Sequence, residues 1–362
     1  MKNRPQSVLY LLTSLNTTGG TTSKIKSTLS YTKYKVFIAA NYNPEDYTVV
    51  LPWEEYHNVQ LINIPSRTKI FKIVGKLNKV IRKENIGIVH AFFPAEIYVA
   101  FLLKILNPKI KIIRSFEGCV NRNKAIVILS KAILPYFDKI IFISNYVRDF
   151  YSDITLKCKN KEVIDNAANF TVAFRNREKD NVCKIVSVAG LNIMKNVFMY
   201  AEIGKVLKDR NFPFIMHIVG DGPLRNELQC LIDKYEISEH VKLEGYKLDP
   251  KPYYESGYIY IHPADKEGFG IVVAEAMSTG LPVIVANKGG VQELVNHMHD
   301  GIIADAYNAE EWADAIIQLY NDKELYIKLS KNGYDTYKSK YTPEIFAKNL
   351  DNVYDSLLGK NI

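Results

Sequence analysis

Two glutamates with a glycine-bearing turn between them are the residues of this sequence best suited to chemistry. Glu267 precedes Gly268-Phe269-Gly270, and Glu275 follows eight positions after Glu267. Residues 271–277 favour a helix, and Gly280 favours its end. The N-terminus of such a helix aims free backbone N–H groups at the turn, which suits an anion such as a phosphate. The pattern predicts a ligand-binding turn with two carboxylates beside it.

The flanking segments place this turn at the edge of a sheet. Residues 258–262 form an apolar run before the turn, and residues 283–285 form another after the helix. Strand, turn, helix and strand in this order belong to open α/β sheets, which bind ligands at the carboxyl ends of their strands. The alternative is an ordinary unit of this kind, with solvated glutamates and glycines that only turn the chain.

The rest of the chain alternates short apolar runs with helical patterns, which predicts parallel sheets covered on both faces. Further strands are expected near residues 8–12, 36–40, 59–64, 86–90, 110–116, 139–143, 163–164, 184–188, 214–219, 241–246 and 301–305. Helices are expected near residues 22–31, 69–84, 95–106, 224–235, 252–255 and 309–320. A chain of 362 residues is long for one domain. We expect domains at 1–174 and 175–341, followed by a last helix over 342–362.

Residues 267–293 resemble the carboxyl-side signature of the family 4 retaining glycosyltransferases of the GT-B fold. In that family a Glu, a turn of this type and a second Glu eight positions later hold the donor nucleotide-sugar. Gly289-Gly290 continues the match, and His262-Pro263, residues 220–223 and Lys195 support it upstream. The resemblance implies two Rossmann-like domains that face each other across a cleft. The first would be the acceptor side and the second the donor side, with the last helix crossing back to the first.

The resemblance also implies roles for residues of the donor side. Lys195 and the N–H groups of the turn would neutralise the departing diphosphate, Glu275 would accept hydrogen bonds from ribose hydroxyls, and Glu267 would meet the transferred sugar. The implied catalytic residues are Glu267 and Lys195. The implied donor-binding residues are Gly19, Gly20, Gly190, Asn196, Gly220, Gly268, Phe269, Gly270, Ile271, Val272 and Glu275.

One departure from the family concerns the diphosphate. Relatives carry Gly-Arg-Leu, three residues and then Lys; here Ala189 takes the Gly position and Gly190 the Arg position, while Lys195 is kept. One phosphate cation is therefore missing. A lysine still binds phosphate as a point charge, without the bidentate fork of arginine.

The acceptor side departs from the family as well. His90 ends an expected strand, but Phe92 stands where relatives have a polar residue, and Phe116 stands where many have a functional His. We name His90, Arg114 and Glu117 as candidate acceptor-binding residues. The alternative for His90 is a core histidine whose nitrogens are satisfied inside the protein, and the alternative for Gly19-Gly20 is a plain loop.

Positive charge is concentrated in the first half of the chain. Residues 1–174 carry 25 Lys and Arg against 12 Asp and Glu, whereas the remainder carries 22 against 27. This favours an anionic partner: a membrane surface, a phosphorylated lipid acceptor or nucleic acid, the alternative being solvated lysines. The expected helix 69–84 combines an apolar stripe with a basic face. We expect peripheral contact with an anionic membrane and no nucleic acid.

The sequence favours no metal and no cofactor. The four cysteines (Cys119, Cys158, Cys183 and Cys230) have no metal-ligand spacing and fit a reducing compartment. The N-terminal apolar run is short and favours a buried strand over a signal peptide. No run reaches the roughly 20 apolar residues that span a bilayer. We expect a cytoplasmic protein, peripheral on the inner face of the cell membrane.

The function implied is transfer of a sugar, of the hexosyl type, from a nucleotide-sugar to an acceptor hydroxyl with retention of configuration. The acceptor would be a sugar or a lipid-linked sugar, in polysaccharide or glycolipid biosynthesis. Two alternatives stay open. A nucleotide-sugar epimerase shares the GT-B fold, and a catalytically inactive subunit that only binds the nucleotide-sugar would fit Phe92, Phe116 and Gly190.

Overall fold

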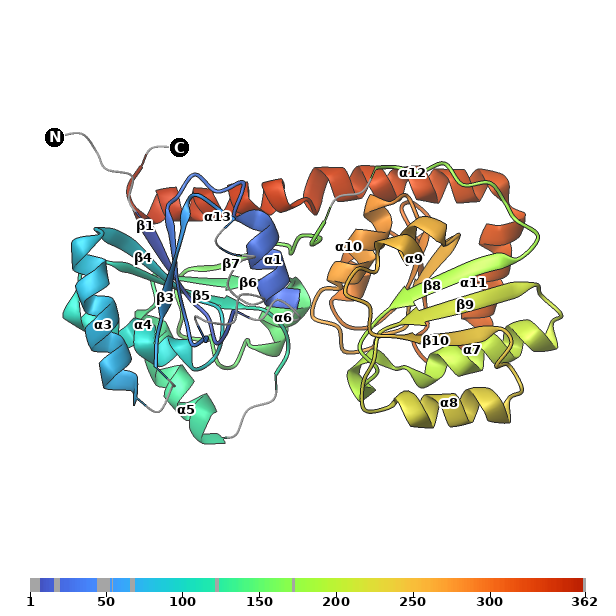
Figure 1. Cartoon of the computed structure of the whole chain (residues 1–362), viewed down its shortest axis with the longest axis horizontal. Helices are drawn as coiled ribbons and strands as arrows, with labels where there is room; N and C mark the ends of the chain where they lie inside the picture. Colours follow the sequence, from blue (N-terminus) through green and yellow to red (C-terminus); the bar gives the residue numbers. More distant parts are fainter. Residues whose placement is uncertain are drawn as a thin grey trace. The chain divides into compact units, whose positions relative to one another are not determined.

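The chain forms two compact units in a computed structural model, which describes residues 7–15, 20–43, 53, 55–65, 69–120, 124–170 and 173–360. Unit 1 comprises Met1–Asn169 and Pro343–Ile362, and unit 2 comprises Phe170–Thr342. Each unit holds one parallel sheet with helices on it (Figure 1). This confirms the predicted α/β class with two Rossmann-like domains. No helix among the described residues is long and apolar enough to cross a membrane.

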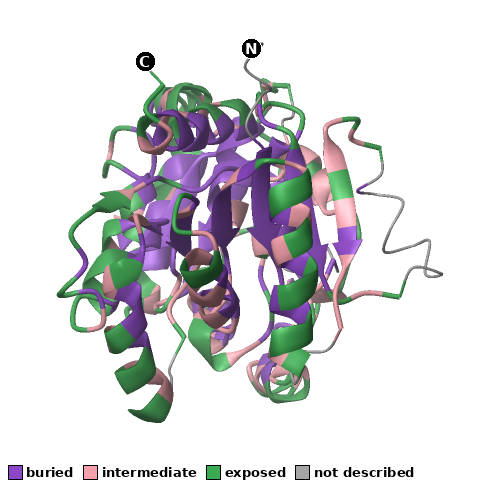
Figure 2. Ribbon diagram, turned by 90° about the vertical axis from the view of Figure 1, so that its left-hand side faces the viewer, coloured by how far each residue is buried: buried purple, intermediate pink, exposed green. Residues whose placement is uncertain are grey.

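The sheet of unit 1 has seven strands in the order β3-β2-β1-β4-β5-β6-β7. All neighbouring strands are parallel. The strands are β1 (Ser7–Leu11), β2 (Val36–Ala40), β3 (Val59–Asn63), β4 (Ile86–Ala91), β5 (Lys111–Phe116), β6 (Lys139–Phe142) and β7 (Lys161–Val163). Every residue of β1 and β2 is buried, as expected for parallel strands covered on both faces. Figure 2 shows the strands mainly in purple and the helices in alternating purple and green.

The helices of unit 1 include the last helix of the chain. They are α1 (Gly20–Thr28), α3 (Ile70–Lys83), α4 (Glu96–Leu106), α5 (Lys124–Ile133), α6 (Asn145–Phe150) and α13 (Pro343–Leu357), with a 3-10 turn η2 (Leu134–Tyr136). On α13, Phe346, Leu350 and Val353 join the same buried cluster as Val8 of β1 and Ile38 of β2. The structure thus confirms that the last helix packs on the first domain.

The sheet of unit 2 has six parallel strands in the order β10-β9-β8-β11-β12-β13. The strands are β8 (Cys183–Val188), β9 (Phe214–Val219), β10 (Val241–Gly245), β11 (Ile259–His262), β12 (Val283–Ala286) and β13 (Ile302–Ala304). The strand order reverses between β8 and β11, because β9 and β10 lie on one side and β12 and β13 on the other. The carboxyl ends of β8 and β11 therefore form the switch point where α/β sheets of this type bind ligands.

The helices of unit 2 include two that the sequence patterns did not predict, at Phe198–Asp209 and Lys323–Lys340. They are α7 (Phe198–Asp209), α8 (Arg225–Lys234), α9 (Lys251–Ser256), α10 (Ile271–Ser278), α11 (Ala309–Asn321) and α12 (Lys323–Lys340), with 3-10 turns η3 (Ile193–Lys195) and η4 (Val291–Leu294). The buried positions of α12 include Ser330, Gly333 and Tyr337. These residue types give a weak apolar stripe, which explains why α12 was missed.

Candidate active site

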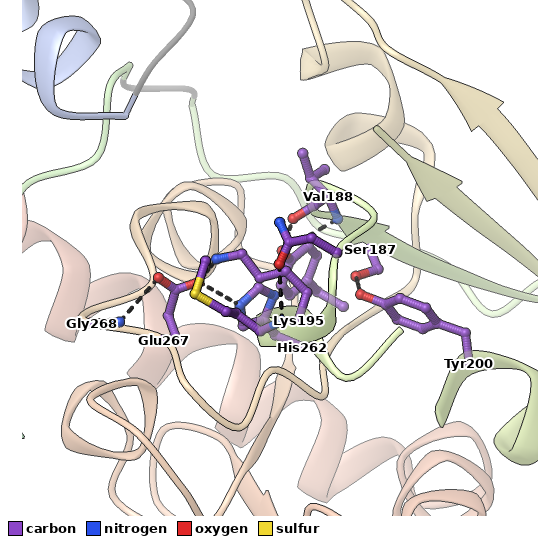
Figure 3. Close-up of polar contacts among 10 residues, drawn as sticks. Ser187, Val188, Lys195, Tyr200, His262, Glu267 and Gly268 are labelled. Atoms are coloured by element: carbon purple, nitrogen blue, oxygen red, sulfur yellow. Dashed lines mark hydrogen bonds and ion pairs between the residues drawn. The ribbon is translucent and has the colours of Figure 1, made fainter. Parts of the chain in front are cut away.

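Lys195, His262 and Glu267 meet at the switch point of unit 2. The Lys195 ammonium pairs with Oε2 of Glu267, and Nε2 of His262 lies 3.2 Å from the same oxygen (Figure 3). Lys195 ends the turn η3 that follows β8, and His262 is the last residue of β11. Because β8 and β11 are parallel neighbours, the loops at their carboxyl ends bring the three side chains together.

The charge state of this cluster follows from its burial. His262 is buried, and burial lowers its pKa, so the ring is neutral at pH 7 and Nε2 donates to Glu267. Burial alone would raise the pKa of Glu267, but the Lys195 ammonium and the hydrogen bond from His262 hold that pKa well below its usual range. Glu267 is therefore ionised, with its carboxylate held in one orientation.

Two glycines hold the backbone of Glu267. The N–H of Gly290 donates to the carbonyl oxygen of Glu267 at 2.7 Å. Gly289 has a φ of 72°, and a Cβ there would lie 2.9 Å from the same carbonyl oxygen. Only glycine allows this close approach without strain. The Gly-Gly pair of the sequence pattern thus positions the catalytic candidate.

The turn after Glu267 opens helix α10. Gly270 has a φ of 103° and precedes Ile271, the first residue of the helix. Ile271 and Val272 are half-buried, and the first N–H groups of a helix have no acceptor within it. These groups are available to an anion at the turn. The ring of Phe269 is buried and packs edge-on against that of Tyr341, with 5.6 Å between the ring centres. The Phe269 side chain thus anchors the turn in the core.

Glu275 lies on α10, where its side chain is buried. The hydroxyl of Tyr254, on α9, donates to Oε2 of Glu275 at 2.9 Å. Sequence reasoning missed Tyr254, because an aromatic residue in a short helix carries no chemical signal of its own. It also missed His262 as a contact of Glu267, although a histidine at a strand end five positions before a glutamate is a usable signal.

The other donor-side candidates lie in the loops around the cluster. Asn196 has a φ of 48°, and its Nδ2 donates to the carbonyl oxygens of Ala306 at 2.7 Å and Pro263 at 3.3 Å. It thereby ties three loops together. Gly220 has a φ of 140°, and a Cβ there would lie 2.0 Å from the carbonyl oxygen of Ala189. Gly190 is exposed in the turn after β8.

The acceptor-side candidate His90 lies in the core of unit 1. Its Nδ1 lies 2.8 Å from the Tyr354 hydroxyl, and its Nε2 lies 2.7 Å from the Ser115 hydroxyl. The ring stacks on that of Phe92, with 4.0 Å between the two ring centres. His90 is fully buried, and burial lowers its pKa well below the usual value. Both nitrogens are thus engaged inside the protein, as the core interpretation of His90 requires.

Arg114 and Glu117 lie in the same part of unit 1. Nη1 of Arg114 donates to the carbonyl oxygen of Ala91 at 3.2 Å, and Arg114 is buried. Glu117 pairs with Lys24 of α1 at 2.5 Å, and burial lowers the pKa of Lys24. The structure thus joins Glu117 to the helix that begins at the exposed Gly20. Gly19 lies outside the described residues.

The predicted absence of a metal and of a cofactor stays a prediction. Within the described ranges, no three His, Cys, Asp or Glu side chains gather as metal ligands would.

Unit 2 contains the part of the chain that matches a known protein family. The model of the family "Glycosyl transferases group 1" matches residues 170–336, which contain the whole cluster of Lys195, His262 and Glu267. Over these residues the chain is similar to that family. The match begins at the first residue of unit 2 and ends within α12.

The chain is also similar to individual glycosyltransferases. It is 26% identical over 326 residues to an uncharacterized glycosyltransferase of Methanocaldococcus jannaschii, with 84% of this chain and 86% of that protein covered. It is 31% identical over 160 residues to the UDP-Gal:alpha-D-GlcNAc-diphosphoundecaprenol alpha-1,3-galactosyltransferase of Escherichia coli, with 42% and 40% covered. A glycosyltransferase of Rickettsia africae has a similar structure, with a TM-score of 0.82 at 18% identity over 99% and 100% of the two chains. These comparisons confirm the GT-B fold and support a glycosyltransferase.

Proposed function

We propose that this protein is a retaining glycosyltransferase, of the family 4 type, that moves a sugar from a nucleotide-sugar to an acceptor hydroxyl. The observation that carries the proposal is the cluster of Lys195, His262 and Glu267 beside the N-terminus of α10. An ammonium group, a fixed carboxylate and helix N–H groups at one switch point suit a ligand that has both phosphates and sugar hydroxyls.

The donor's diphosphate would meet one ammonium group and the N–H groups at the start of a helix. An ammonium group has three N–H donors, and Lys195 directs one toward Glu267, so two remain for phosphate oxygens. The N–H groups of Ile271 and Val272 would add to them at the start of α10. Glu275 would accept the ribose hydroxyls, oriented by the hydroxyl of Tyr254.

In the transfer step the bond between the anomeric carbon and the diphosphate oxygen breaks, and the diphosphate leaves with the electron pair. The acceptor oxygen bonds to the same face of the anomeric carbon, and its hydroxyl proton passes to the departing diphosphate oxygen on that face. Positive charge develops at the anomeric carbon and negative charge on the diphosphate. Glu267, kept ionised by its neighbours, would stabilise the first, and Lys195 the second.

The acceptor we propose is a sugar or a lipid-linked sugar, in polysaccharide or glycolipid biosynthesis. The Escherichia coli relative acts, by its name, on a sugar carried by a diphosphoundecaprenol lipid. The exposed lysines of α3 in unit 1 would attract anionic lipid, so that the protein works peripherally at the inner face of the membrane.

The test is a panel of nucleotide-sugars added to the protein while its thermal unfolding is followed. A ligand that binds only the native state raises the unfolding midpoint. The donor so found is then incubated with lipid-linked and free sugar acceptors, and the anomeric configuration of the product is read by NMR. We expect transfer with retention. An inverted product would contradict retention, an epimerised nucleotide-sugar would favour the epimerase, and binding with no turnover would favour the inactive subunit.

A further inference from the structure

Unit 2 contains a pocket with a volume of about 740 Å³. It lies between the extended segment 173–180 and helix α12, which run side by side in Figure 1. The residues that shape its walls and rim are Phe174, Arg177, Tyr258, Tyr320, Tyr326 and Tyr334. Its volume lies in the range of pockets that hold small molecules.

This pocket is separate from the candidate active site. Tyr258 precedes β11, and Lys179 lies shortly before β8, so the pocket lies at the amino ends of these strands. Lys195 and Glu267 follow the carboxyl ends of the same two strands. A ligand in the pocket would therefore lie at the edge of the sheet opposite to the proposed donor.

Many of the residues that line the pocket are aromatic. Tyr258 and Tyr326 stack at 4.2 Å, and the ring of Phe174 lies 5.1 Å from that of Tyr334. The Tyr326 hydroxyl donates to the carbonyl oxygen of Tyr258 at 3.0 Å, and the Tyr320 hydroxyl donates to that of Asp180 at 2.6 Å. Tyr258, Tyr320 and Tyr326 are buried, so the half-buried Phe174 and Tyr334 and the exposed Ile327 supply the accessible apolar surface. This favours a ligand with a flat apolar body.

The rim of the pocket is basic. Lys323 and Lys331 of α12 are exposed, and neither forms an ion pair within the described part of the chain. Nζ of Lys179 lies 4.0 Å from the centre of the Tyr320 ring. With Arg177, these cations outnumber the two acidic lining residues, Glu178 and Asp335. The charge complements an anionic group on the ligand.

We propose that this pocket is a second ligand site, for a flat apolar molecule that carries one anionic group such as a carboxylate or sulfonate, and that this ligand regulates donor binding. The apolar body would lie against Phe174, Ile327 and Tyr334, the apolar lining side chains that are not buried. The anionic group would lie at the rim beside Lys323 and Lys331.

The regulatory part follows from the contacts between the pocket and the C-terminal end of α10, and it rests on the proposed function. Nη1 of Arg177 donates to the carbonyl oxygen of Thr279 at 2.8 Å, and Oγ of Ser330 donates to that of Gly280 at 2.6 Å. The ring of Phe174 lies against Gly280. Three residues that line the pocket thus hold one end of the helix whose other end forms part of the candidate active site.

The test uses 8-anilinonaphthalene-1-sulfonate, an aromatic sulfonate whose fluorescence rises on apolar surfaces, with the full-length protein. We expect saturable binding of one probe per chain. The double variant Lys323→Glu/Lys331→Glu should weaken probe binding at least tenfold. The matched control, Lys328→Glu/Lys340→Glu, changes two exposed lysines of the same helix outside the pocket and should change binding less than twofold. Equal loss in both variants, or no binding at all, would overturn the proposed site.

The regulatory part is tested by titrating UDP at zero and at saturating probe. A shift of at least threefold in the dissociation constant of UDP, which levels off as the probe saturates, is expected. Linkage requires UDP to shift probe affinity by the same factor. If the dissociation constant of UDP does not change, the regulatory part is overturned. If UDP binding keeps weakening as more probe is added, the probe binds in the donor site and the proposal is overturned. If neither UDP nor any nucleotide-sugar binds, the proposed function fails, while the comparison of lysine variants still decides whether the pocket binds the probe.

Discussion

Nε2 of His262 lies 3.2 Å from Oε2 of Glu267, the oxygen that also pairs with Lys195. A neutral histidine can only donate through one nitrogen, so this contact sets the tautomer of the ring. The second oxygen of the carboxylate accepts the N–H of Gly268 at 3.2 Å. Glu267 thus enters any reaction ionised and already oriented, which makes it the residue whose loss should affect chemistry most.

Replacement of Glu267 with Gln should lower the turnover number more than tenfold and change donor affinity much less. The amide keeps the size of the side chain but loses the charge that would stabilise the anomeric carbon. Turnover and donor dissociation constants are measured on the same preparations, with circular dichroism as a check of folding. The exposed Glu310→Gln is the matched control. Turnover within about twofold of wild type would contradict the catalytic assignment of Glu267.

Removal of the Lys195 ammonium should weaken binding of a nucleoside diphosphate. A hydrogen bond to a charged group is worth about 1.5–3 kcal/mol, so we expect Lys195→Ala to raise the dissociation constant by roughly 10- to 150-fold. Titration calorimetry gives the constants directly. Lys205→Ala, which removes an exposed lysine of α7, should leave them unchanged. Equal binding to wild type and Lys195→Ala would mean that other groups hold the diphosphate.

Replacement of Tyr254 with Phe should raise the KM for the donor more than it lowers the turnover number. It removes one hydroxyl, the donor to the buried carboxylate of Glu275, and leaves the ring in place. Without this hydrogen bond the Glu275 carboxylate would be less well oriented toward the ribose. The atoms that react would keep their positions. Tyr253→Phe is the control, because that neighbouring hydroxyl donates to Glu244 instead. If both variants behave alike, Tyr254 does not act through Glu275.

The buried histidines should make the protein less stable in acid. His90 has an ordinary pKa of 6.5 when unfolded and a pKa well below that when folded, because burial disfavours its charged form. Below pH 6.5 the unfolded state binds more protons, so the free energy of unfolding falls as the pH falls toward the folded pKa. For one histidine, the slope of the free energy of unfolding against pH approaches about 1.4 kcal/mol per pH unit.

Urea unfolding between pH 7.5 and 5.5 measures this slope. His90→Asn should flatten it relative to wild type, even though the variant is less stable at every pH. The exposed His57→Asn is the matched control. An unchanged slope in His90→Asn would show that His90 does not contribute.

Membrane attraction should depend on the basic face of α3. Lys69, Lys72, Lys76, Lys79 and Lys83 are exposed on or beside this helix, and the Phe71 side chain, 81% exposed, stands among them. Each lysine near an anionic surface contributes about 1 kcal/mol, an effect that fades with salt. Co-sedimentation with vesicles of graded anionic content should show binding that rises with lipid charge.

A variant with these five lysines changed to Gln should bind such vesicles weakly. Its control changes five exposed lysines of unit 2, namely Lys205, Lys234, Lys247, Lys328 and Lys340, and should bind like wild type. Equal loss in both variants, or binding that ignores lipid charge, would exclude α3 as the membrane contact. The proposed glycosyl transfer does not depend on this result.

The fold class could be read from the sequence because its signals are local. Parallel strands buried on both faces appear as continuous apolar runs, and β1, β2 and β11 appear so. The turn from Glu267 to Gly270 and the helix after it were predicted from neighbouring residues alone. The last helix was predicted from its own apolar stripe, and it packs in the core of unit 1.

Tertiary structure alone decided which distant residues meet. Glu267 pairs with Lys195, 72 positions away, and His90 contacts Tyr354, 264 positions away. No periodic pattern records such partners, because side-chain periodicity describes one element at a time. Helix α12 was missed for a related reason: its buried Ser330 and Gly333 pack against Gly280 and Asp300 of other segments, and only those neighbours make a small residue fit there. The sequence thus determined most of the elements and the chemistry of the turn, and the packing between elements determined the candidate site and the pocket beside α12.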